Sequence, residues 1–368
     1  MKAGHRTARP ALELFVWSRL ALWGLAAGTV LLFEAHSNPL RGRWDRPRLH
    51  DLGPAVDVWA RWDSDWYVQI AQHGYVWPSS RPAFFPLYPL LVAGLGRALG
   101  DHPVLAGVLV SLVACAGAFV LLERLARLKL GEEGARRAVL FLAVFPTTLF
   151  LGAVYSESLF LLLTLASFLL AERGRFLAAG AAGGLAALTR PVGLALVPAL
   201  VLLAWRSGRR RRALAGAALV PLAFALYPLA LWLWIGRPFA FLEAQSGIWR
   251  RHLSPYGPLG GFVEGVQQHA VKDLLVAVAL VALALLAWRR LGAAYGAYAL
   301  ASLLLPLTWP SDTHALWSIS RFGLVLFPVQ LVLASLAGTR LRAAAVAVVL
   351  AGLAAYAVVK WALWYWVA

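Results

Sequence analysis

The chain has little charge and almost no sulfur. Only 14% of its 368 residues are Asp, Glu, Lys or Arg, whereas a water-soluble domain has about 25%. The single cysteine, Cys115, excludes an intramolecular disulfide and says nothing of the redox compartment. One methionine contrasts with 17 tryptophans, and 61% of the residues are hydrophobic. These proportions exclude both an ordinary soluble enzyme and a disordered chain.

The hydrophobic residues form blocks long enough to cross a lipid bilayer, for which about 20 residues are needed. We therefore predict an all-α polytopic membrane protein, a single integral membrane domain over 1–368, with about 11 transmembrane helices. Basic residues before the first block, and no small-residue cleavage site after it, predict an uncleaved first helix. The predicted spans are 14–33, 103–122, 137–155, 157–171, 175–189, 191–205, 212–235, 271–288, 292–309, 321–338 and 342–366.

Segment 84–99 is apolar but contains Pro86, Pro89 and Arg97, so hydropathy alone does not decide whether it crosses. Short cytoplasmic loops carry an excess of Lys and Arg. If 84–99 lies in the outer interface, every basic cluster falls on one side of the membrane. These clusters lie at 2–9, 124–137, 173–175, 206–212, 289–290 and 340–342.

This charge pattern predicts that the N-terminus is cytoplasmic, with a first outer loop at 34–102 and a second at 236–270. The formal net charge of +17 is then mainly a topology signal. Its partners are anionic lipid headgroups, and no nucleic acid is needed to explain it.

Charged residues close to membrane depth are costly and usually mark a functional site. The predicted topology brings Asp63, Glu157, Arg190 and Arg321 to the outer face, although they are far apart in the sequence. His314 lies in a short loop at the same face, where it is either a proton shuttle or incidental. This convergence is the main reason to predict a site there.

Residues 61–75 predict a short helix lying on the outer leaflet. Asp63, Trp66, Tyr67 and Ile70 would share one face of it, and Gly74 would end it. Tryptophan and tyrosine favour the membrane interface. Asp63 then stands at the level of the lipid headgroups, either as a functional acid or merely as the cap of the helix.

The string Asp63-Ser64-Asp65 also fits a D-x-D metal motif. Two carboxylates two residues apart in a helix point in different directions. Mg²⁺ and Mn²⁺ would also need further oxygen ligands. We therefore predict no cofactor, with a divalent metal as the less favoured alternative.

Three polar turns interrupt the later hydrophobic blocks. Glu157 suits a polar turn, a substrate hydroxyl or an arginine partner. Arg190 precedes Pro191, which favours the first position of a helix, and either snorkels or binds a phosphate. Arg321 begins a hydrophobic run, where a helix N-terminus and a guanidinium would together hold a phosphate. The alternative for Arg321 is an ion pair with Asp312 or Glu157.

The second outer loop contains another predicted surface helix, at 241–251. Gln245 and Trp249 lie four residues apart on it. An aromatic ring beside an amide is typical of a sugar site, but Trp249 also suits the aromatic belt of a membrane interface.

The first-loop string Arg61-Trp62-Asp63-Ser64, followed by Tyr67 and by Tyr88 within 83–89, resembles the signature of the PIG-V-type mannosyltransferases. The strings at 155–160, 188–193 and 320–322 also resemble later motifs of that family. Phe322 stands where eukaryotic members often have tyrosine, so no hydroxyl acts there. The resemblance runs from about 60 to 330.

This family belongs to the GT-C glycosyltransferases, integral membrane enzymes with lipid-phosphate sugar donors and a catalytic acid in the first outer loop. The resemblance implies that Asp63 is the catalytic acidic residue. From the layout of the site we predict that Asp63 is the general base, that Arg321 supported by Arg190 stabilises the phosphate, and that Glu157 orients the sugar or an arginine. Eukaryotic relatives add mannose to a GPI lipid. A composition rich in Ala, Arg, Leu and Gly predicts a bacterial source, so a lipid, glycan or protein acceptor stays open. The candidate substrate-binding residues are Arg61, Trp62, Asp65, Tyr67, Tyr88, Arg190, Gln245, Trp249 and His314.

We therefore predict inverting transfer of mannose or another hexose from a polyprenyl-phosphate donor, at the extracytoplasmic face of the bacterial cytoplasmic membrane. The alternative is a multi-span lipid or sugar transporter or flippase. Transporters usually place their charges at the bilayer midplane and often consist of two similar halves. A non-catalytic scaffold is a third, weaker alternative.

Overall fold

The computed structural model describes residues 9–206 and 210–368, and within these ranges its only strand-like feature is a bridge between Arg251 and Ser311. The predicted all-α class is therefore confirmed. The α-helices are α1 Arg9–Phe33, α2 Pro54–Asp57, α3 Ser64–His73, α4 Leu87–Ala98, α5 Pro103–Ala143, α6 Glu157–Glu172, α7 Phe176–Thr189, α8 Leu196–Arg206, α9 Arg210–Ile235, α10 Ala240–Ser246, α11 Gly260–Gln267, α12 Val271–Leu291, α13 Ala293–Thr308, α14 Ile319–Val325, α15 Phe327–Leu336 and α16 Arg340–Ala362.

Among the described residues, 5 helices are long and apolar enough to cross a membrane: α1, α5, α9, α12 and α16. The pair α14 and α15 passes the same test together, bent by 79°. Helices α6, α7 and α13 are shorter, at 16, 14 and 16 residues. The structure thus supports an all-α membrane protein, and the full set of about 11 spans stays a prediction.

Helices α7 and α9 pack closely because glycines meet at their contact. A Cβ atom on Gly180 would lie 1.9 Å from the carbonyl oxygen of Gly216, and one on Gly216 would lie 2.2 Å from that of Phe176. Small residues let helix backbones approach where lipid supplies no hydrophobic driving force. The Ala- and Gly-rich sequence of α7 is therefore a packing surface.

The predicted span at 137–155 is α-helical only as far as Ala143. Helix α5 ends at Ala143, and the chain then turns at Pro146 before a short 3₁₀ helix, Thr148–Leu151. Arg19 of α1, which is buried, donates hydrogen bonds to the carbonyl oxygens of Ala143 and Thr148, at 3.3 and 2.8 Å. A proline cannot continue the helical hydrogen bonding, and the arginine satisfies the carbonyl groups that the break leaves free.

The predicted span at 321–338 is also broken. Leu326 lies between α14 and α15 with non-helical backbone angles, and Pro328 follows in the first turn of α15. Because proline has no N–H, it suits a helix start and opposes a helix interior. The break leaves Arg321 on α14, a helix of 7 residues.

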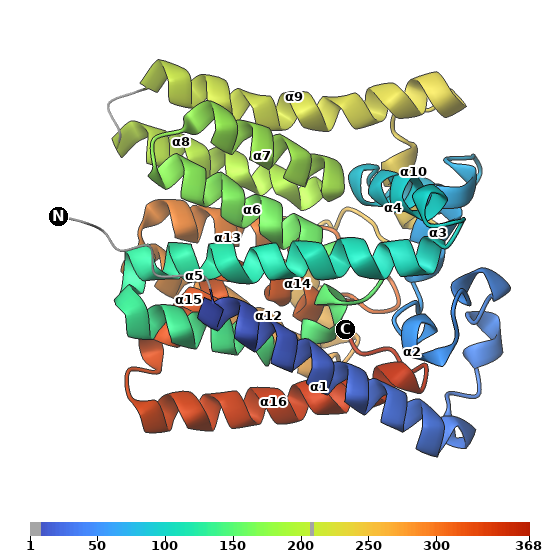
Figure 1. Cartoon of the computed structure of the whole chain (residues 1–368). Coiled ribbons are helices and arrows are strands. Elements are labelled where there is room, and N and C mark those ends of the chain that lie inside the picture. Colours follow the sequence, from blue (N-terminus) through green and yellow to red (C-terminus); the bar gives the residue numbers. More distant parts are fainter. Residues whose placement is uncertain (1–8, 207–209) are drawn as a thin grey trace.

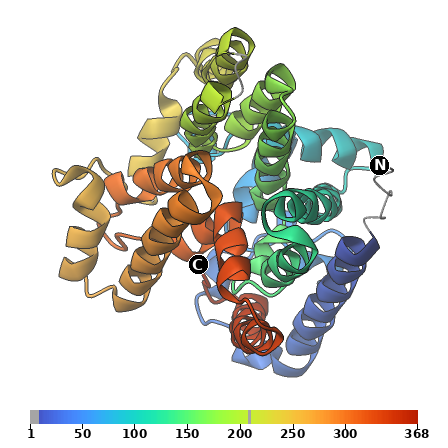
Figure 2. The same ribbon diagram turned by 90° about the vertical axis from the view of Figure 1, so that its left-hand side faces the viewer.

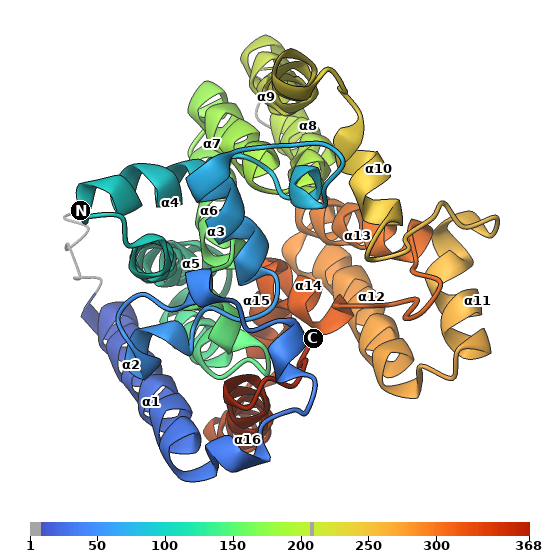
Figure 3. The ribbon, with the colours of Figure 1, turned by 90° about the vertical axis from the view of Figure 1, so that its right-hand side faces the viewer.

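The two ends of the helical bundle differ (Figures 1 and 2). At one end the turns are short and are joined by arginine: Arg137 donates to the carbonyl oxygen of Ala337 at 2.7 Å, and Arg290 to Ser335 Oγ at 3.3 Å. At the other end lie α2, α3, α10 and α11, which belong to the first and second predicted outer loops (Figure 3). Of the predicted basic clusters, residues 2–6 and 207–209 lie outside the described part of the chain.

Helix α4 belongs to the end that carries the loops. Its 12 residues give a length of about 18 Å, well below the roughly 30 Å of a bilayer core. Tyr88, near its start, donates a hydrogen bond at 3.0 Å to the carbonyl oxygen of Gly107 in the first turns of α5. The structure therefore agrees with a segment 84–99 that does not cross by itself.

Candidate functional site

Asp63 immediately precedes α3, and its carboxylate does not cap that helix. No side-chain cap hydrogen bond forms at this position. Instead, Arg321 Nη1 donates to Asp63 Oδ2 at 3.0 Å. The helix itself ends where the sequence predicted, at Gly74 with φ 67°. The structure thus excludes the capping alternative and joins the first loop to α14.

Glu157 begins α6 and is completely buried. Its Oε1 atom lies 2.5 Å from Arg190 Nη1 and 3.3 Å from Arg321 Nε. Only 13% of the Arg190 side chain is exposed, so Arg190 pairs with an acid and does not snorkel. The sequence offered Asp312 or Glu157 as an ion-pair partner of Arg321. The structure pairs Arg321 with Glu157, because the Asp312 carboxylate lies 2.9 Å from His252 Nδ1 instead.

The site is a row of alternating charges in the order Asp63, Arg321, Glu157, Arg190. Buried charges are tolerated when each has an oppositely charged partner, and this row is neutral overall. Glu157 Oε2 is buried without a hydrogen-bond partner among the described residues. Both guanidinium groups suit a phosphate chemically, and in this structure carboxylates hold them.

Tyr155 fixes the backbone on both sides of Asp63. Its hydroxyl accepts a hydrogen bond from the Asp63 N–H at 3.0 Å and donates one to the carbonyl oxygen of Arg61 at 3.2 Å. Tyr155 is buried. The chain direction at Asp63 is therefore set by the turn that leads into α6, and α6 begins at Glu157.

Aromatic rings surround the Arg321 guanidinium. Its Cζ atom lies 5.4 Å from the ring centre of Phe150, 5.3 Å from that of Tyr155 and 5.5 Å from that of Trp366. Cation–π contacts of this kind contribute about 2 kcal/mol each when desolvated. Arg321 therefore stays charged and oriented although it is buried.

The predicted residues Arg61 and Trp62 also border the site. The Arg61 guanidinium stacks over Trp364, with 4.1 Å between Cζ and the ring centre. Burial lowers the pKa of Arg61 to about 10, so it remains a cation at neutral pH. Trp62 packs against Trp44 and Trp366, with ring centres 5.3 and 5.6 Å apart.

Tyr67 and Tyr88 lie under the site as packing residues. The Tyr67 hydroxyl hydrogen-bonds Ser156 Oγ at 2.8 Å, and that of Tyr88 lies 2.9 Å from Ser111 Oγ. Burial, together with the nearby Glu157 carboxylate, raises the pKa of Tyr67, so its hydroxyl keeps its proton at neutral pH. That both bind substrate stays a prediction.

Asp65 is separated from the charged row. Its carboxylate accepts hydrogen bonds from the Arg48 guanidinium, at 2.5 and 2.9 Å, and from Gln69 Nε2 at 2.7 Å. The two carboxylates of the D-x-D string thus bind different arginines, as predicted for neighbours in a helix. Among the described residues, no three His, Cys, Asp or Glu side chains gather as metal ligands would.

The remaining predicted residues lie around the rim of this end. Trp249 packs against Trp66 and Phe84, with ring centres 6.3 and 5.6 Å apart. Gln245 lies in α10, and its carbonyl oxygen accepts from the Arg251 N–H at 3.0 Å. His314 is exposed beside Trp317. The structure therefore brings Trp249 against α3, whereas no contact of Gln245 or His314 with the charged row is found among the described residues.

Arg251 is a half-buried residue of the second loop that the sequence did not single out. It donates to the carbonyl oxygens of Trp309 and Trp317, at 3.0 and 3.1 Å. Burial and the nearby Arg321 cation lower its pKa to about 10. Its position in the sequence could have marked it as functional. Arg250 and Arg251 are adjacent arginines in a predicted outer loop, whereas Lys and Arg are usually concentrated in cytoplasmic loops.

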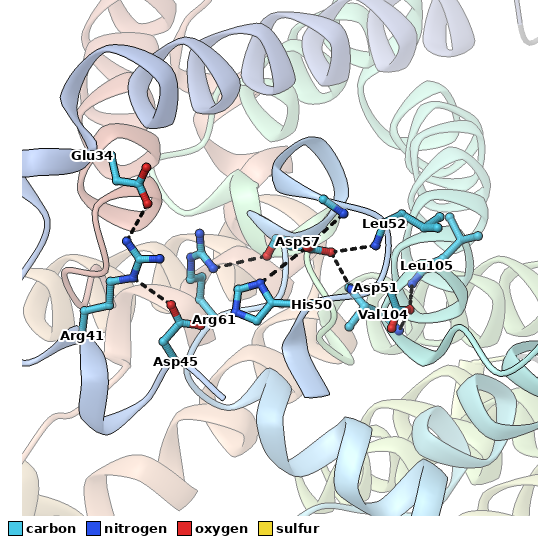
Figure 4. Close-up of polar contacts among 11 residues, drawn as sticks. Glu34, Arg41, Asp45, His50, Asp51, Leu52, Asp57, Arg61, Val104 and Leu105 are labelled. Carbon is cyan, nitrogen blue, oxygen red and sulfur yellow. Dashed lines mark hydrogen bonds and ion pairs between the residues drawn. The ribbon is translucent and has the colours of Figure 1, made fainter. Parts of the chain in front are cut away.

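The first loop is held in place by its own polar network (Figure 4). Asp51 Oδ2 accepts from the N–H groups of Val104 and Leu105, at 2.7 and 3.1 Å, which caps α5. Asp57 accepts from the N–H groups of Asp51 and Gly53, at 2.9 and 3.1 Å. Since carboxylates at helix N-termini satisfy free N–H groups, the loop that carries Asp63 is anchored to a spanning helix.

A cavity of about 400 Å³ lies at the opposite end of the bundle, lined by Lys129, Glu172 and Tyr295 among others. Lys129 and Tyr295 both bind Glu172, the tyrosine at 2.9 Å. None of the predicted site residues lines this cavity, so it is not the candidate site.

These features define a class: an all-helical membrane protein with a buried, ion-paired acid and arginine site at the end of the bundle that carries its large loops. A family model described as Mannosyltransferase (PIG-V) matches residues 55–203. Over these residues the chain is similar to the PIG-V mannosyltransferases, which confirms the resemblance.

Curated relatives that carry the name GPI alpha-1,6-mannosyltransferase 2 include three from rat, mouse and human. The rat (Rattus norvegicus) protein is 35% identical over 151 residues, which are 38% of this chain and 30% of the relative. The mouse (Mus musculus) and human (Homo sapiens) proteins are 35% identical over 145 and 126 residues, or 37% and 32% of this chain and 29% and 25% of theirs. The chain thus spans less than a third of the length of these relatives. No solved structure matches it.

Proposed function

We propose that this protein is a membrane glycosyltransferase that transfers mannose or another hexose from a polyprenyl-phosphate donor to an acceptor hydroxyl. The match over 55–203 contains Asp63, Glu157 and Arg190. Arg321 lies outside it and yet contacts the first two. The observation that carries the proposal is the ion pair of Asp63 with Arg321, because it places a base beside a phosphate-binding group.

In the proposed mechanism the donor separates this ion pair. The phosphodiester of a polyprenyl-phosphate sugar is an anion, and a guanidinium binds such oxygens through two parallel hydrogen bonds. Arg321 would exchange Asp63 for the phosphate and keep Glu157. The Asp63 carboxylate is then released at the moment when the donor is in place.

The transfer itself is a single displacement. The acceptor hydroxyl gives its proton to Asp63, and its oxygen forms the new bond to the anomeric carbon. The bond from that carbon to the phosphate oxygen breaks, and its electron pair leaves with the polyprenyl phosphate. Arg321, supported by Arg190, stabilises this developing charge, and one displacement inverts the anomeric centre.

We place the reaction at the extracytoplasmic face of a bacterial cytoplasmic membrane. The supporting observation is that arginine-rich turns lie at the end of the bundle opposite to Asp63, since such turns are usually cytoplasmic. The acceptor is the hydroxyl of a lipid, glycan or protein.

The test replaces Asp63 by alanine and by asparagine. A positioned general base contributes about 10²- to 10⁴-fold, so both variants should lose at least two orders of magnitude in transfer from purified polyprenyl-phosphate mannose. The control is Glu243→Gln, an exposed acid of the second loop that pairs with Arg237. Near wild-type turnover in both Asp63 variants excludes Asp63 as the base. A wild-type protein that transfers from none of a panel of polyprenyl-phosphate hexoses contradicts the function.

A further inference from the structure

Two tryptophans outside the family match lie beside the proposed catalytic pair. Trp364 and Trp366 follow the end of α16 at Ala362. Asn38 of the first loop holds this segment: its N–H donates to the carbonyl oxygen of Leu363 at 2.9 Å, and its Nδ2 to that of Trp364 at 3.1 Å. The segment is therefore fixed at the end of the bundle that Figure 3 faces.

Trp62, Trp364 and Trp366 form what we name the tryptophan cluster. The ring centre of Trp62 lies 6.4 Å from that of Trp364 and 5.6 Å from that of Trp366, both in edge-to-face geometry. Trp62 adjoins Asp63 in the sequence, and the Trp366 ring lies 5.5 Å from Arg321 Cζ. The cluster thus borders both members of the Asp63–Arg321 pair.

The backbone of the cluster is strained. Trp62 has φ 54° and Trp364 has φ 63°, in the left-handed region that bulky side chains rarely adopt. Such conformations persist only where the surrounding structure imposes them, and they gather at functional sites. Two of them in contacting tryptophans indicate that the positions of these rings matter.

The polar atoms of the cluster are unsatisfied. The indole Nε1 atoms of Trp62, Trp364 and Trp366 are all buried without a hydrogen-bond partner among the described residues. Buried polar groups are normally paired, and indole N–H can only donate. A ligand that binds these N–H groups therefore needs acceptor atoms.

Other tryptophans show that this is not simply an aromatic belt. Trp17 and Trp232 are 70% and 58% exposed, as expected for residues that face lipid. Trp361, one helical turn before Trp364, is completely buried, and its Nε1 donates to the carbonyl oxygen of Val58 at 2.7 Å. Trp361 thus has its hydrogen bond, whereas Trp59, which is buried against Trp23, has an Nε1 without a partner among the described residues. The cluster differs from Trp59 because it borders the Asp63–Arg321 pair.

We propose that the tryptophan cluster is a binding subsite for a pyranose ring, whose hydroxyl oxygens accept the three indole hydrogen bonds while its C–H face lies on the aromatic surface. This inference rests on the proposed function, because it assigns sugar recognition to the same site. The pyranose is the sugar of the donor or a sugar of the acceptor, and the two are distinguished by kinetics.

The test is Trp366→Phe in the full-length protein, which keeps one aromatic ring and removes the N–H donor together with the five-membered ring of the indole. Loss of one neutral hydrogen bond weakens binding by about three- to tenfold. The donor in this assay is a short-chain prenyl-phosphate mannose. If the KM for this donor rises by that factor both in transfer to the acceptor and in hydrolysis of the donor by water, the subsite belongs to the donor. A rise confined to the acceptor KM assigns it to the acceptor.

Thermal unfolding separates binding from packing. Trp366→Phe loses some ring packing but no hydrogen bond within the protein, so it should lower Tm less than Trp361→Phe does. Trp361→Phe loses packing and a hydrogen bond, and it should leave both KM values unchanged. Trp232→Phe controls for an exposed ring and should change neither. Wild-type KM values for donor and acceptor in Trp366→Phe, with transfer intact, overturn the subsite and leave the proposed function standing. Absence of transfer in the wild type is a failure of the proposed function instead.

Discussion

The charged side chains of the site stabilise one another only as a set. Glu157 is buried between two guanidinium groups, and it is the sole carboxylate within ion-pair distance of Arg190 among the described residues. Removing one partner of a buried ion pair usually costs about 3–5 kcal/mol, because the other charge is left uncompensated. We therefore expect Glu157→Gln to lower stability by about that amount in thermal unfolding.

The double variant Glu157→Gln/Arg190→Gln is the control for this prediction. Because it removes both charges, it should be more stable than Glu157→Gln alone. If the double variant loses the sum of the two single losses, the pair is not coupled and the alternating row of charges is not the source of stability.

Single residues of the site could be predicted where a charge interrupts an apolar run. Glu157, Arg190 and Arg321 show this pattern, whereas Asp63 was predicted from the helical face at 61–75 and from the family resemblance. The structure brings all four together. Their mutual pairing did not follow from the pattern, because snorkelling and helix capping explain the same residues equally well. Trp364 and Trp366 were counted within the predicted span 342–366, so their position beside Trp62 depended on where α16 ends.

At the scale of elements, the first loop depends on acids that pair with cations. Asp45 accepts hydrogen bonds from Arg41 Nε at 2.7 Å and contacts His50 Nε2 at 2.6 Å (Figure 4). Burial by itself would raise the pKa of Asp45, but the hydrogen bonds from Arg41 and His50 outweigh it and lower the pKa below the ordinary 3.8. The stabilisation is therefore fully present above that value and is lost as the pH falls through the lower, folded-state value.

We expect amide hydrogen exchange over 41–57 to stay slow at neutral pH and to become faster below about pH 4, once corrected for the intrinsic pH dependence of exchange. Asp45→Asn should show faster exchange already at neutral pH, with a smaller change on acidification. Protection that is independent of Asp45 at both pH values would show that the loop is held by its other contacts alone.

The ends of helices were less predictable than their existence. The apolar runs over 137–155 and 321–338 each predict one continuous helix, yet α5 stops at Ala143 and α14 at Val325. In both places a proline follows within a few residues. Whether a proline kinks a helix or ends it depends on which group satisfies the freed carbonyls, and the contribution of Arg19 to the first break comes from a different helix.

At the scale of the whole molecule, the polar groups are divided between two ends. Arg137, Arg290 and Lys129 make their contacts among short turns, whereas Asp63 and Arg321 lie among the long loops. The charges of the loops were enough to predict this division. Which end of the bundle a loop reaches depends on the order of the spans in the sequence and not on how the helices pack. The partner of each helix could not be predicted, since apolar helix faces in lipid carry no pairing signal beyond small residues such as those of α7.

This division predicts that the two ends face opposite compartments. Cys115, the one native cysteine, is buried, so an introduced cysteine will dominate labelling by a membrane-impermeant maleimide. Gln72→Cys on α3 and Arg173→Cys after α6 both replace exposed residues. In intact spheroplasts Gln72→Cys should be labelled and Arg173→Cys should react only after the membrane is permeabilised. If both cysteines were labelled from outside, the basic turns and Asp63 would lie on the same side of the membrane. That result would contradict the proposed extracytoplasmic location of the reaction.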